Sequence, residues 1–220
     1  MFNIAVDGPG GAGKSTICRA VSAELGFIYV DTGALYRAVG LNALRHGLDT
    51  KDSDAIEKML SDTDVKLAFV DGERRVMLNG EDVSDDIRLP EASMAASNVS
   101  AIPVVRQFLF DLQQKIASEN NCLMDGRDIG TVVLPNADLK IFLTASAEVR
   151  AMRRYDELVE KGQDVNFDDI LKDLNERDYQ DSHRAVAPLK QAEDAILVDT
   201  SDMTFDEVKG KIKSLVKERI

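Results

Sequence analysis

A glycine-rich stretch near the start of the sequence ends in a lysine and a serine. Residues 8–15, Gly-Pro-Gly-Gly-Ala-Gly-Lys-Ser, fit the pattern G-x-x-x-x-G-K-[ST], and we call them the phosphate loop. Glycines let successive backbone N–H groups converge on phosphates, Lys14 can bridge the β- and γ-phosphates, and the Ser15 hydroxyl can bind Mg²⁺. The predicted ATP-binding residues are Gly8, Pro9, Gly10, Gly11, Ala12, Gly13, Lys14, Ser15 and Thr16. The alternative is a glycine-rich turn without a ligand, which has no need of Lys-Ser at its end.

Charged residues and glycine also follow two other short apolar runs. Asp31-Thr32-Gly33 follows a run that ends at Val30, and Asp125-Gly126-Arg127-Asp128 follows one that ends at Met124. Ligands gather at the carboxyl ends of strands in an open parallel sheet, so these segments are candidates for holding a second substrate. Asp125 stands where the carboxylate that orients the magnesium shell is expected, with a helix N-cap or turn aspartate as the alternative.

Arginines recur at helical spacing in the last third of the chain. One predicted helix carries Arg150, Arg153 and Arg154 at i, i+3 and i+4, and the next carries Arg177, Asp181 and Arg184 at i, i+4 and i+7. Phosphoryl transfer needs cations around the moving group, so we expect these clusters to bind an anion. The alternative is a solvated face on which Arg177 pairs with Asp181.

Alternating strands and helices must position these residues. Five short apolar runs predict buried strands, at residues 2–6, 27–30, 122–124, 139–143 and 195–198. Apolar residues at helical spacing predict helices over 17–25, 105–116 and 205–216, the last beginning with a capping box from Thr204 to Glu207. This alternation predicts an α/β fold whose parallel sheet is covered on both faces.

One segment departs from the α/β alternation. Val65, Leu67 and Phe69 alternate with polar residues, and Asp71-Gly72 and Asn79-Gly80 are typical hairpin turns. The pattern predicts a small antiparallel meander over residues 65–83, inserted between helices at 53–60 and 90–100. An edge extension of the main sheet is the alternative.

Composition limits the function classes. The chain has 220 residues, a length that suits one globular domain with insertions. Its formal net charge of -12 disfavours a protein that binds the phosphate backbone of a nucleic acid. We expect no membrane span, because no stretch approaches ~20 apolar residues, and the N-terminus does not resemble a secretory signal. Cys18 and Cys122 lack metal-ligand spacing, so we expect no zinc and a cytoplasmic protein.

The phosphate loop alone does not separate a kinase from an ATPase or a GTPase. The sequence contains no Asn-Lys-x-Asp guanine signature and no strand that ends in adjacent Asp-Glu. A non-enzymatic nucleotide switch remains the second hypothesis, and the candidate acceptor residues argue against it.

The chain resembles the bacterial-type cytidylate kinases of the nucleoside monophosphate kinase family from end to end. The shared segments are GPGGAGKST, DTGALYR, GEDVSDDIR, Ala95-Ala96-Ser97 with Arg106, DGRDIGTVVLP, KIFLTAS and HRAVAPL. DGRDIGTVV and RAVAPL, in this order after a phosphate loop, are specific to that family. The resemblance implies transfer of the γ-phosphate of ATP to CMP or dCMP, with Mg²⁺ and without a covalent intermediate, by a monomer.

The resemblance also implies a division of the chain. A five-stranded parallel core would comprise residues 1–32, 101–149 and 167–220, with an acceptor-binding region over 33–100 that carries the β insert at about 65–83. A short lid would span residues 150–166. The lid and the acceptor region would close over the two substrates.

Finally, the resemblance implies roles for single residues. The residues that resemble those around the acceptor phosphate are Thr32, Arg37 and Arg127. The residues that resemble those recognising cytosine are Ser97, Arg106 and Asp128. The residues that resemble those near the ribose and phosphates are Arg177, Asp181 and Arg184. Asp125 joins the substrate-binding set, and the predicted catalytic residues are Lys14, Arg127, Arg150, Arg153, Arg177 and Arg184. The base-recognition set is chemically sound, because a carboxylate accepts from cytosine N4 while a guanidinium and a hydroxyl donate to O2 and N3. Ser15 stands where many relatives have Gly and Thr32 where many have Ser, and both replacements keep the chemistry.

Overall fold

The structure, a computed structural model, describes residues 1–70 and 73–220, with side chains described outside residues 69–74. The chain divides into two compact units. We call the first the core unit, which comprises Met1–Val30 and Ile116–Ile220, and the second the inserted unit, which comprises Asp31–Lys115. The two are described separately below.

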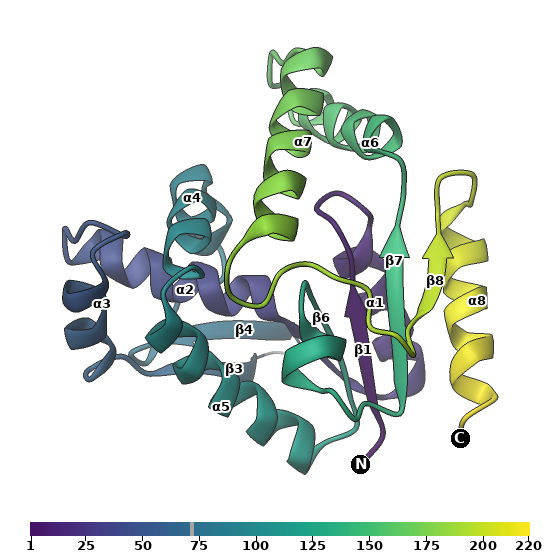
Figure 1. Ribbon diagram of the computed structural model, residues 1–220, viewed down its shortest axis with the longest axis horizontal. Helices are drawn as coiled ribbons and strands as arrows, with labels where there is room; N and C mark the ends of the chain where they lie inside the picture. Colours follow the sequence, from purple (N-terminus) through teal and green to yellow (C-terminus); the bar gives the residue numbers. More distant parts are fainter. Residues whose placement is uncertain (71–72) are drawn as a thin grey trace. The chain divides into compact units, whose positions relative to one another are not determined.

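A five-stranded parallel sheet forms the centre of the core unit (Figure 1). Its strands, in chain order, are β1 (Asn3–Asp7), β2 (Ile28–Asp31), β6 (Cys122–Gly126), β7 (Leu139–Thr144) and β8 (Ile196–Asp199). Their order in the sheet is β2-β6-β1-β7-β8. All five predicted strands are present within two residues of their predicted ends, and the predicted α/β fold with a parallel core is confirmed.

Helices follow these strands as the alternating pattern predicts. They are α1 (Lys14–Leu25), α6 (Ala147–Glu160), α7 (Phe167–His183) and α8 (Phe205–Lys217), with α5 (Pro103–Glu119) leading from the inserted unit into β6. The predicted capping box is present, since the Thr204 side chain and the Glu207 side chain each accept a backbone N–H at the start of α8. The predicted placement of Arg184 on a helix is wrong, because α7 ends at His183 and Arg184 has extended backbone angles.

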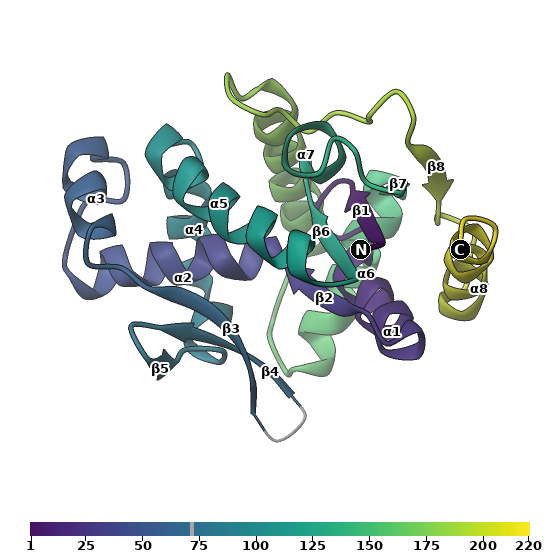
Figure 2. The same ribbon diagram turned by 90° about the horizontal axis from the view of Figure 1, so that it is seen from below.

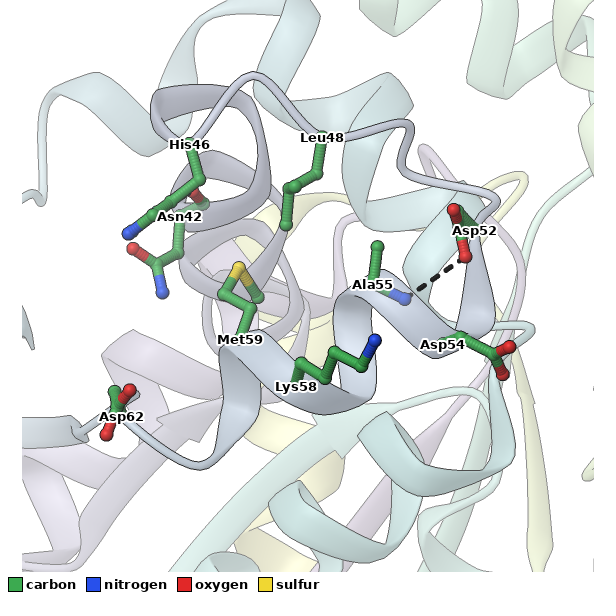
Figure 3. A pocket seen from close by; sticks show the side chains of 9 residues that line it. All are labelled: Asn42, His46, Leu48, Asp52, Asp54, Ala55, Lys58, Met59 and Asp62. Atoms are coloured by element: carbon green, nitrogen blue, oxygen red, sulfur yellow. Dashed lines mark hydrogen bonds between the residues drawn. The ribbon is translucent and has the colours of Figure 1, made fainter.

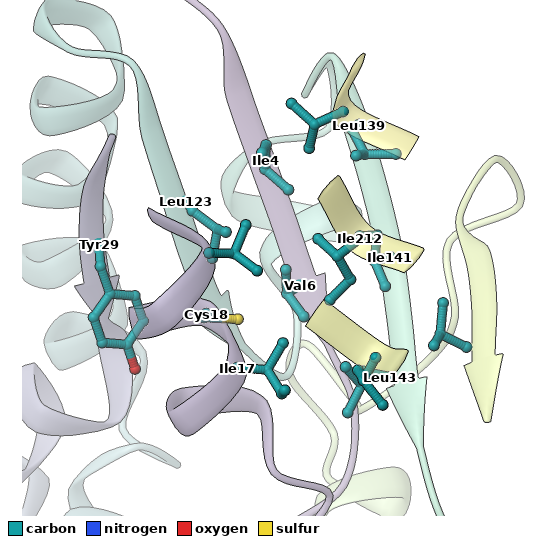
Figure 4. Close-up of a cluster of buried hydrophobic side chains, with 14 of the residues drawn as sticks. Ile4, Val6, Ile17, Cys18, Tyr29, Leu123, Leu139, Ile141, Leu143 and Ile212 are labelled. Carbon is teal, nitrogen blue, oxygen red and sulfur yellow. The ribbon is translucent and has the colours of Figure 1, made fainter. Parts of the chain in front are cut away.

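The main hydrophobic core lies between the sheet and helices α1 and α8 (Figure 4). Ile4 and Val6 of β1 are buried there with Ile17 of α1 and Ile212 of α8. Successive side chains of a strand point to opposite faces of the sheet, so Asp7 points away from this core. The side chain of Asp7 therefore lies on the opposite face of the sheet.

On that other face a π-helical turn, η2 (Ile129–Val133), contacts β1. The backbone N–H groups of Val132 and Val133 both point at the carbonyl oxygen of Asp128, at 2.9 and 3.2 Å. π-Helical turns are rare and occur mostly at functional sites. This one directly follows the predicted site residues Arg127 and Asp128.

The inserted unit combines helices with a second, smaller sheet, seen from below in Figure 2. Its helices are α2 (Thr32–Arg45), α3 (Ser53–Leu60), the 3₁₀ turn η1 (Asp86–Arg88) and α4 (Pro90–Val99). The strands β3 (Val65–Val70), β4 (Glu73–Leu78) and β5 (Glu81–Asp82) pair antiparallel in the order β3-β4-β5. The predicted meander is confirmed as a sheet of its own rather than an extension of the main sheet. Asn79 and Gly80 turn with φ of 51° and 86°, while the predicted Asp71-Gly72 turn lies outside the described residues.

Helices α2 and α4 approach each other at Gly40. A Cβ atom on Gly40 would lie 2.8 Å from the backbone nitrogen of Ala96 and 2.9 Å from the Cβ of Ala95. Any side chain would force the two backbones apart, so glycine is required at this position. None of the helices in the described ranges is long and apolar enough to cross a lipid bilayer.

Candidate active site

The phosphate loop connects β1 to α1 and is wedged into the core unit. Gly8 has φ of +148°, and a Cβ there would lie 1.9 Å from the carbonyl oxygen of Leu143 at the end of β7. A Cβ on Gly11 would lie 3.2 Å from the Cβ of Arg150. The N-terminus of α1 follows Gly13 directly, so the positive end of its dipole faces the loop. The loop is thus a preformed site for an anion.

Lys14 is buried at the base of this loop. Its Nζ donates hydrogen bonds to the carbonyl oxygens of Gly8 and Pro9, both at 2.7 Å. Burial and, after it, the positive charge of Arg127 lower the pKa of Lys14 to about 7, while Asp125 acts in the opposite direction. An anion placed against the ammonium group would restore its pKa towards the usual value.

Asp125 lies within β6, not after it, and both of its carboxylate oxygens accept a hydroxyl proton. The Ser15 hydroxyl donates to Oδ2 at 2.9 Å, and the Tyr29 hydroxyl donates to Oδ1 at 3.1 Å. This places a serine hydroxyl and a buried carboxylate together at the start of α1. Hard oxygen donors of this kind suit Mg²⁺, which in nucleotide sites is shared between one or two protein groups and the substrate phosphates.

Two ion pairs join the segment after β6 to the end of α7. The Nε of Arg127 lies 2.8 Å from Asp181 Oδ2, and Nη2 of Arg184 lies 3.3 Å from Asp128 Oδ1. Arg184 lies outside α7, contrary to the prediction, but it still contacts the predicted site residue Asp128. The structure brings four of the predicted substrate-binding residues into one cluster.

This cluster lies against the phosphate loop. A Cβ on Gly10 would lie 3.6 Å from Nη2 of Arg127 and 3.9 Å from the Cδ of Arg177. Two cationic side chains therefore border the loop at the same glycine. The arrangement concentrates positive charge in a chain whose net charge is strongly negative.

The segment after α7 folds back over the end of that helix. Nε of Arg184 donates to the carbonyl oxygen of Ala187 at 2.5 Å, and the N–H of Leu189 donates to the carbonyl oxygen of Asp181 at 2.8 Å. Ala187 has φ of 48°, an uncommon conformation for a residue with a side chain. These contacts fix Arg184 beside Asp128.

Arg150 and Arg153 of α6 bind different parts of the core unit. The buried guanidinium of Arg150 donates to the carbonyl oxygen of Gly10 at 2.9 Å and to Asp178 at 2.6 Å. Arg153 donates to the carbonyl oxygen of Thr200 at 2.7 Å. The structure does not gather these two predicted catalytic residues at one point. Arg150 holds the phosphate loop through its hydrogen bond to Gly10.

Two of the predicted acceptor residues lie at the start of α2 in the inserted unit. Thr32 is buried, and the N-cap residue Asp31 accepts the N–H of Ala34 at 2.9 Å. The other carboxylate oxygen of Asp31 lies 3.1 Å from Nη2 of Arg37. Asp31 thereby caps α2 and orients the arginine.

The other two predicted acceptor residues lie on α4 and α5. Ser97 is exposed on α4, and Arg106 is half-buried on α5. The guanidinium of Arg106 lies 5.8 Å from the centre of the Tyr36 ring, within cation–π range, and donates to the carbonyl oxygen of Ser100 at 3.4 Å. Arg106 is thus held by two contacts within the inserted unit.

Two site residues were missed by the sequence analysis. Tyr29 counted only as part of an apolar strand, yet its hydroxyl orients Asp125. Asp7 ends an apolar run just before the phosphate loop, the same signal that singled out Asp125, but was not selected. Asp7 is buried and accepts two backbone N–H groups of η2.

A pocket of about 530 Å³ opens in the inserted unit between α2 and α3 (Figure 3). It is lined by Asn42, His46, Leu48, Asp52, Asp54, Ala55, Lys58, Met59 and Asp62. Asp52 is already the N-cap of α3, where it accepts the N–H of Ala55 at 3.1 Å. None of the predicted site residues lines this pocket.

The chain shares its fold with solved structures of low sequence identity. It aligns over 98% of its length with 98% of shikimate kinase from Bacteroides thetaiotaomicron, at 12% identity and a TM-score of 0.50. It also aligns over its whole length with an uncharacterized protein from Eubacterium ventriosum, at 10% identity and a TM-score of 0.53. At these identities the likeness concerns the fold alone.

Comparison of sequences is more specific. The chain is 51% identical to the cytidylate kinase of Caldicellulosiruptor bescii over 97% of this chain and 95% of that protein. It is 49% identical to the cytidylate kinase of Ligilactobacillus salivarius over 99% of this chain and 97% of that protein. The family model of cytidylate kinase matches residues 4–218. The chain therefore belongs to the cytidylate kinase family.

Proposed function

We propose that this chain transfers the γ-phosphate of ATP to CMP or dCMP and releases ADP with CDP or dCDP. The observation that carries the proposal is the position of Arg127 and Arg177 against Gly10 of the phosphate loop. Cations placed at that point can stabilise the charge that develops on the transferred phosphoryl group. A nucleotide switch without an acceptor has no need of them.

The donor half of the proposed site is the phosphate loop. Backbone N–H groups and the α1 N-terminus would hold the phosphates of ATP, with Lys14 at the β- and γ-phosphates. Ser15 and Asp125 fit a role in holding Mg²⁺, because their oxygens lie 2.9 Å apart and match the donors that this ion prefers. When bound, Mg²⁺ would neutralise charge on the phosphates.

The acceptor half recognises CMP by charge and by base. In the core unit we propose that Arg127, Arg177 and Arg184 contact phosphates, that Asp181 orients Arg127 near the ribose, and that Asp128 accepts from cytosine N4. In the inserted unit we propose that Thr32 and Arg37 bind the acceptor phosphate and that Ser97 and Arg106 recognise the base, as the resemblance to the family implies.

The proposed reaction is a single in-line displacement. An oxygen of the CMP phosphate forms a bond to the γ-phosphorus while the bond from that phosphorus to the β–γ bridging oxygen breaks, and ADP leaves. The electron pair of the broken bond stays on ADP. No side chain of the enzyme forms a covalent intermediate, so its residues act by positioning and by electrostatic stabilisation.

A panel of monophosphates tests the proposal. With ATP and Mg²⁺ present, kcat/KM should be highest for CMP or dCMP and lower for UMP and AMP. Slow ATP hydrolysis without any accepted monophosphate would contradict it. We further propose that the enzyme works as a monomer in the cytoplasm, which agrees with its two buried cysteines, Cys18 and Cys122, which are not joined in a disulfide bond. Sedimentation at micromolar concentration checks the monomer.

A further inference from the structure

Asp7, the last residue of β1, is a buried charged group that has no role in the proposed mechanism. Its Oδ1 accepts the N–H of Ile129 at 2.8 Å, and its Oδ2 accepts the N–H of Gly130 at 2.7 Å. The first N–H groups of a helical turn have no partner within the turn itself. One carboxylate therefore satisfies two successive donors at the start of η2.

The local packing is built around this contact. Because Ile4 and Val6 face the hydrophobic core, Asp7 must face η2 on the opposite side of the sheet. A Cβ on Gly130 would lie 3.3 Å from Asp7 Oδ2 and 3.2 Å from the Cδ of Lys140. Glycine at position 130 thus permits the close approach of the backbone to the carboxylate.

The segment that Asp7 holds carries two residues of the proposed acceptor half. Arg127 and Asp128 directly precede Ile129, and each forms an ion pair with a residue at the end of α7. We propose that Asp7 is a positioning residue, whose two hydrogen bonds to the start of η2 fix Arg127 and Asp128 for CMP. This inference rests on the proposed function, which assigns those two residues to the acceptor.

The donor half has anchors of its own. Gly8 is pressed against the carbonyl oxygen of Leu143, Arg150 donates to the carbonyl oxygen of Gly10, and Lys14 donates to the carbonyl oxygens at the start of the loop. Loss of the Asp7 carboxylate should therefore disturb the acceptor half more than the ATP site. A group that acted only on general stability would affect both alike.

The charges around Asp7 give the contact a pH dependence. The pKa of Asp7 is raised to about 6, mainly by burial and also by the nearby Asp128 carboxylate, and the two N–H groups and Lys14 limit the rise. Lys140, packed over Gly130, is paired with Asp194 at 2.8 Å. Above pH 6 the ionised carboxylate can accept both N–H groups, whereas a protonated carboxyl group has one oxygen that must donate.

The test compares Asp7→Asn with a matched control, Asp138→Asn, in the full-length enzyme. Asp138 also accepts a backbone N–H of β1, that of Asn3 at 2.7 Å, but at the other end of the strand. Asp7→Asn should lower kcat/KM for CMP by about 10- to 100-fold, as misplacement of site residues by ~1 Å does, and change KM for ATP by less than about 3-fold. Asp138→Asn should leave both parameters within about 2-fold of wild type.

The pH profile supplies a readout that a purely structural role would not move. The deficit of Asp7→Asn relative to wild type should be full at pH 8 and should shrink below pH 6, where wild-type Asp7 is itself protonated. Titration of the CMP phosphate, with a second pKa near ~6, affects both enzymes and cancels in the ratio. A constant ratio from pH 5 to pH 8, or equal losses for CMP and ATP, would overturn the proposal.

If Asp7→Asn fails to fold, Gly130→Ala decides the question, because it keeps the carboxylate and crowds the contact between Asp7 Oδ2 and the backbone at position 130. Selective loss of kcat/KM for CMP supports the proposal, and unchanged CMP kinetics in a folded Gly130→Ala enzyme contradicts it. Asp128→Ala, assayed in parallel, tests the proposed function separately. If Asp128→Ala impairs CMP use while Asp7→Asn does not, only the inference on Asp7 is wrong.

Discussion

Arg184 and Asp128 form an ion pair, with Nη2 of the arginine 3.3 Å from Oδ1 of the carboxylate. The side chain of Asp128 is 8% exposed and that of Arg184 is 17% exposed. The carboxylate proposed to recognise cytosine is therefore held in place by Arg184, which directly follows α7. In the proposed complex the Asp128 carboxylate accepts a hydrogen bond from the N4 amino group.

Asp128 should determine the preference for cytosine. In UMP a carbonyl oxygen replaces the N4 amino group, so two acceptors would face each other, and kcat/KM for CMP should exceed that for UMP by at least ~100-fold. Asp128→Ala should shrink this ratio, mainly by lowering the value for CMP. Steady-state kinetics with both nucleotides check the ratio, with the exposed Asp202→Ala as control.

A second variant at the same position reverses the hydrogen bonding. Asp128→Asn presents an amide N–H₂ group that can donate to the uracil carbonyl, so it should improve UMP relative to CMP. An unchanged ratio in both variants would show that Asp128 does not recognise the base.

Lys14 should be essential for turnover but not for folding. Lys14→Ala removes the cation from the proposed phosphoryl site, and we expect kcat to fall by about 10²- to 10³-fold or more, as for other preorganised groups that stabilise developing charge. Circular dichroism should remain that of wild type. Near-normal turnover in the folded variant would contradict the assignment of the phosphate loop to ATP binding. The control is Lys211→Ala, on the exposed side of α8.

Binding of ATP should be accompanied by proton uptake. Burial lowers the pKa of Lys14 to about 7, so at pH 8 much of it is neutral in the free enzyme, and the phosphates of ATP would raise its pKa on binding. Calorimetry at pH 8 in buffers of different ionisation enthalpy should detect the uptake, which should be smaller at pH 6. Lys14→Arg keeps the charge but does not titrate, so the pH 8 uptake should disappear; uptake that persists would assign it to another group.

Arg150 should matter for stability as well as for activity. Its guanidinium is bound to Gly10, to Asp178 and to the carbonyl oxygen of Ala145. Arg150→Met would leave the Asp178 carboxylate without this partner, so the free energy of unfolding should fall by about 3 kcal/mol, the cost of breaking a buried pair. Urea denaturation measures the loss. Arg154→Met, which removes an exposed i,i+3 pair with Glu157, should cost less than about 0.5 kcal/mol.

We propose that residues 150–166 act as a lid and that this lid and the acceptor region close when both substrates bind. The radius of gyration from small-angle scattering should decrease with CMP and a non-hydrolysable ATP analogue together. No compaction under saturating conditions would count against closure. Because Arg150 is buried, the moving part of the segment should lie beyond it.

The sequence predicted those parts of the molecule that local patterns control. Apolar runs located all five strands of the core, and Thr204 and Glu207 located the start of α8. Helix α2 was not predicted, because the polar residues of its first turn, from Thr32 on, were interpreted as the end of a strand. Arg184 was placed on a helix because its spacing from Arg177 fits one, whereas its backbone is extended and its Nε donates to the carbonyl oxygen of Ala187.

Long-range contacts explain what the sequence could not predict about the site. Asp7 binds N–H groups 122 and 123 positions away, and Arg150 binds a carbonyl oxygen 140 positions away. No local spacing encodes such pairs, because strand order in the sheet decides which segments meet. Arg150 and Arg153 share a helical spacing, yet one supports the loop and the other binds Thr200.

The contact of α2 with α4 at Gly40 affects how amide protons in the inserted unit exchange with solvent. Because the two backbones touch without an intervening side chain, neither helix can shift along the other without opening the contact. Amides of residues 38–42 and 95–99 should therefore exchange with deuterium only when the whole unit unfolds, with one common free energy of opening. A Gly40→Ala enzyme, whose added methyl group separates the helices, should exchange these amides faster, through a separate local opening.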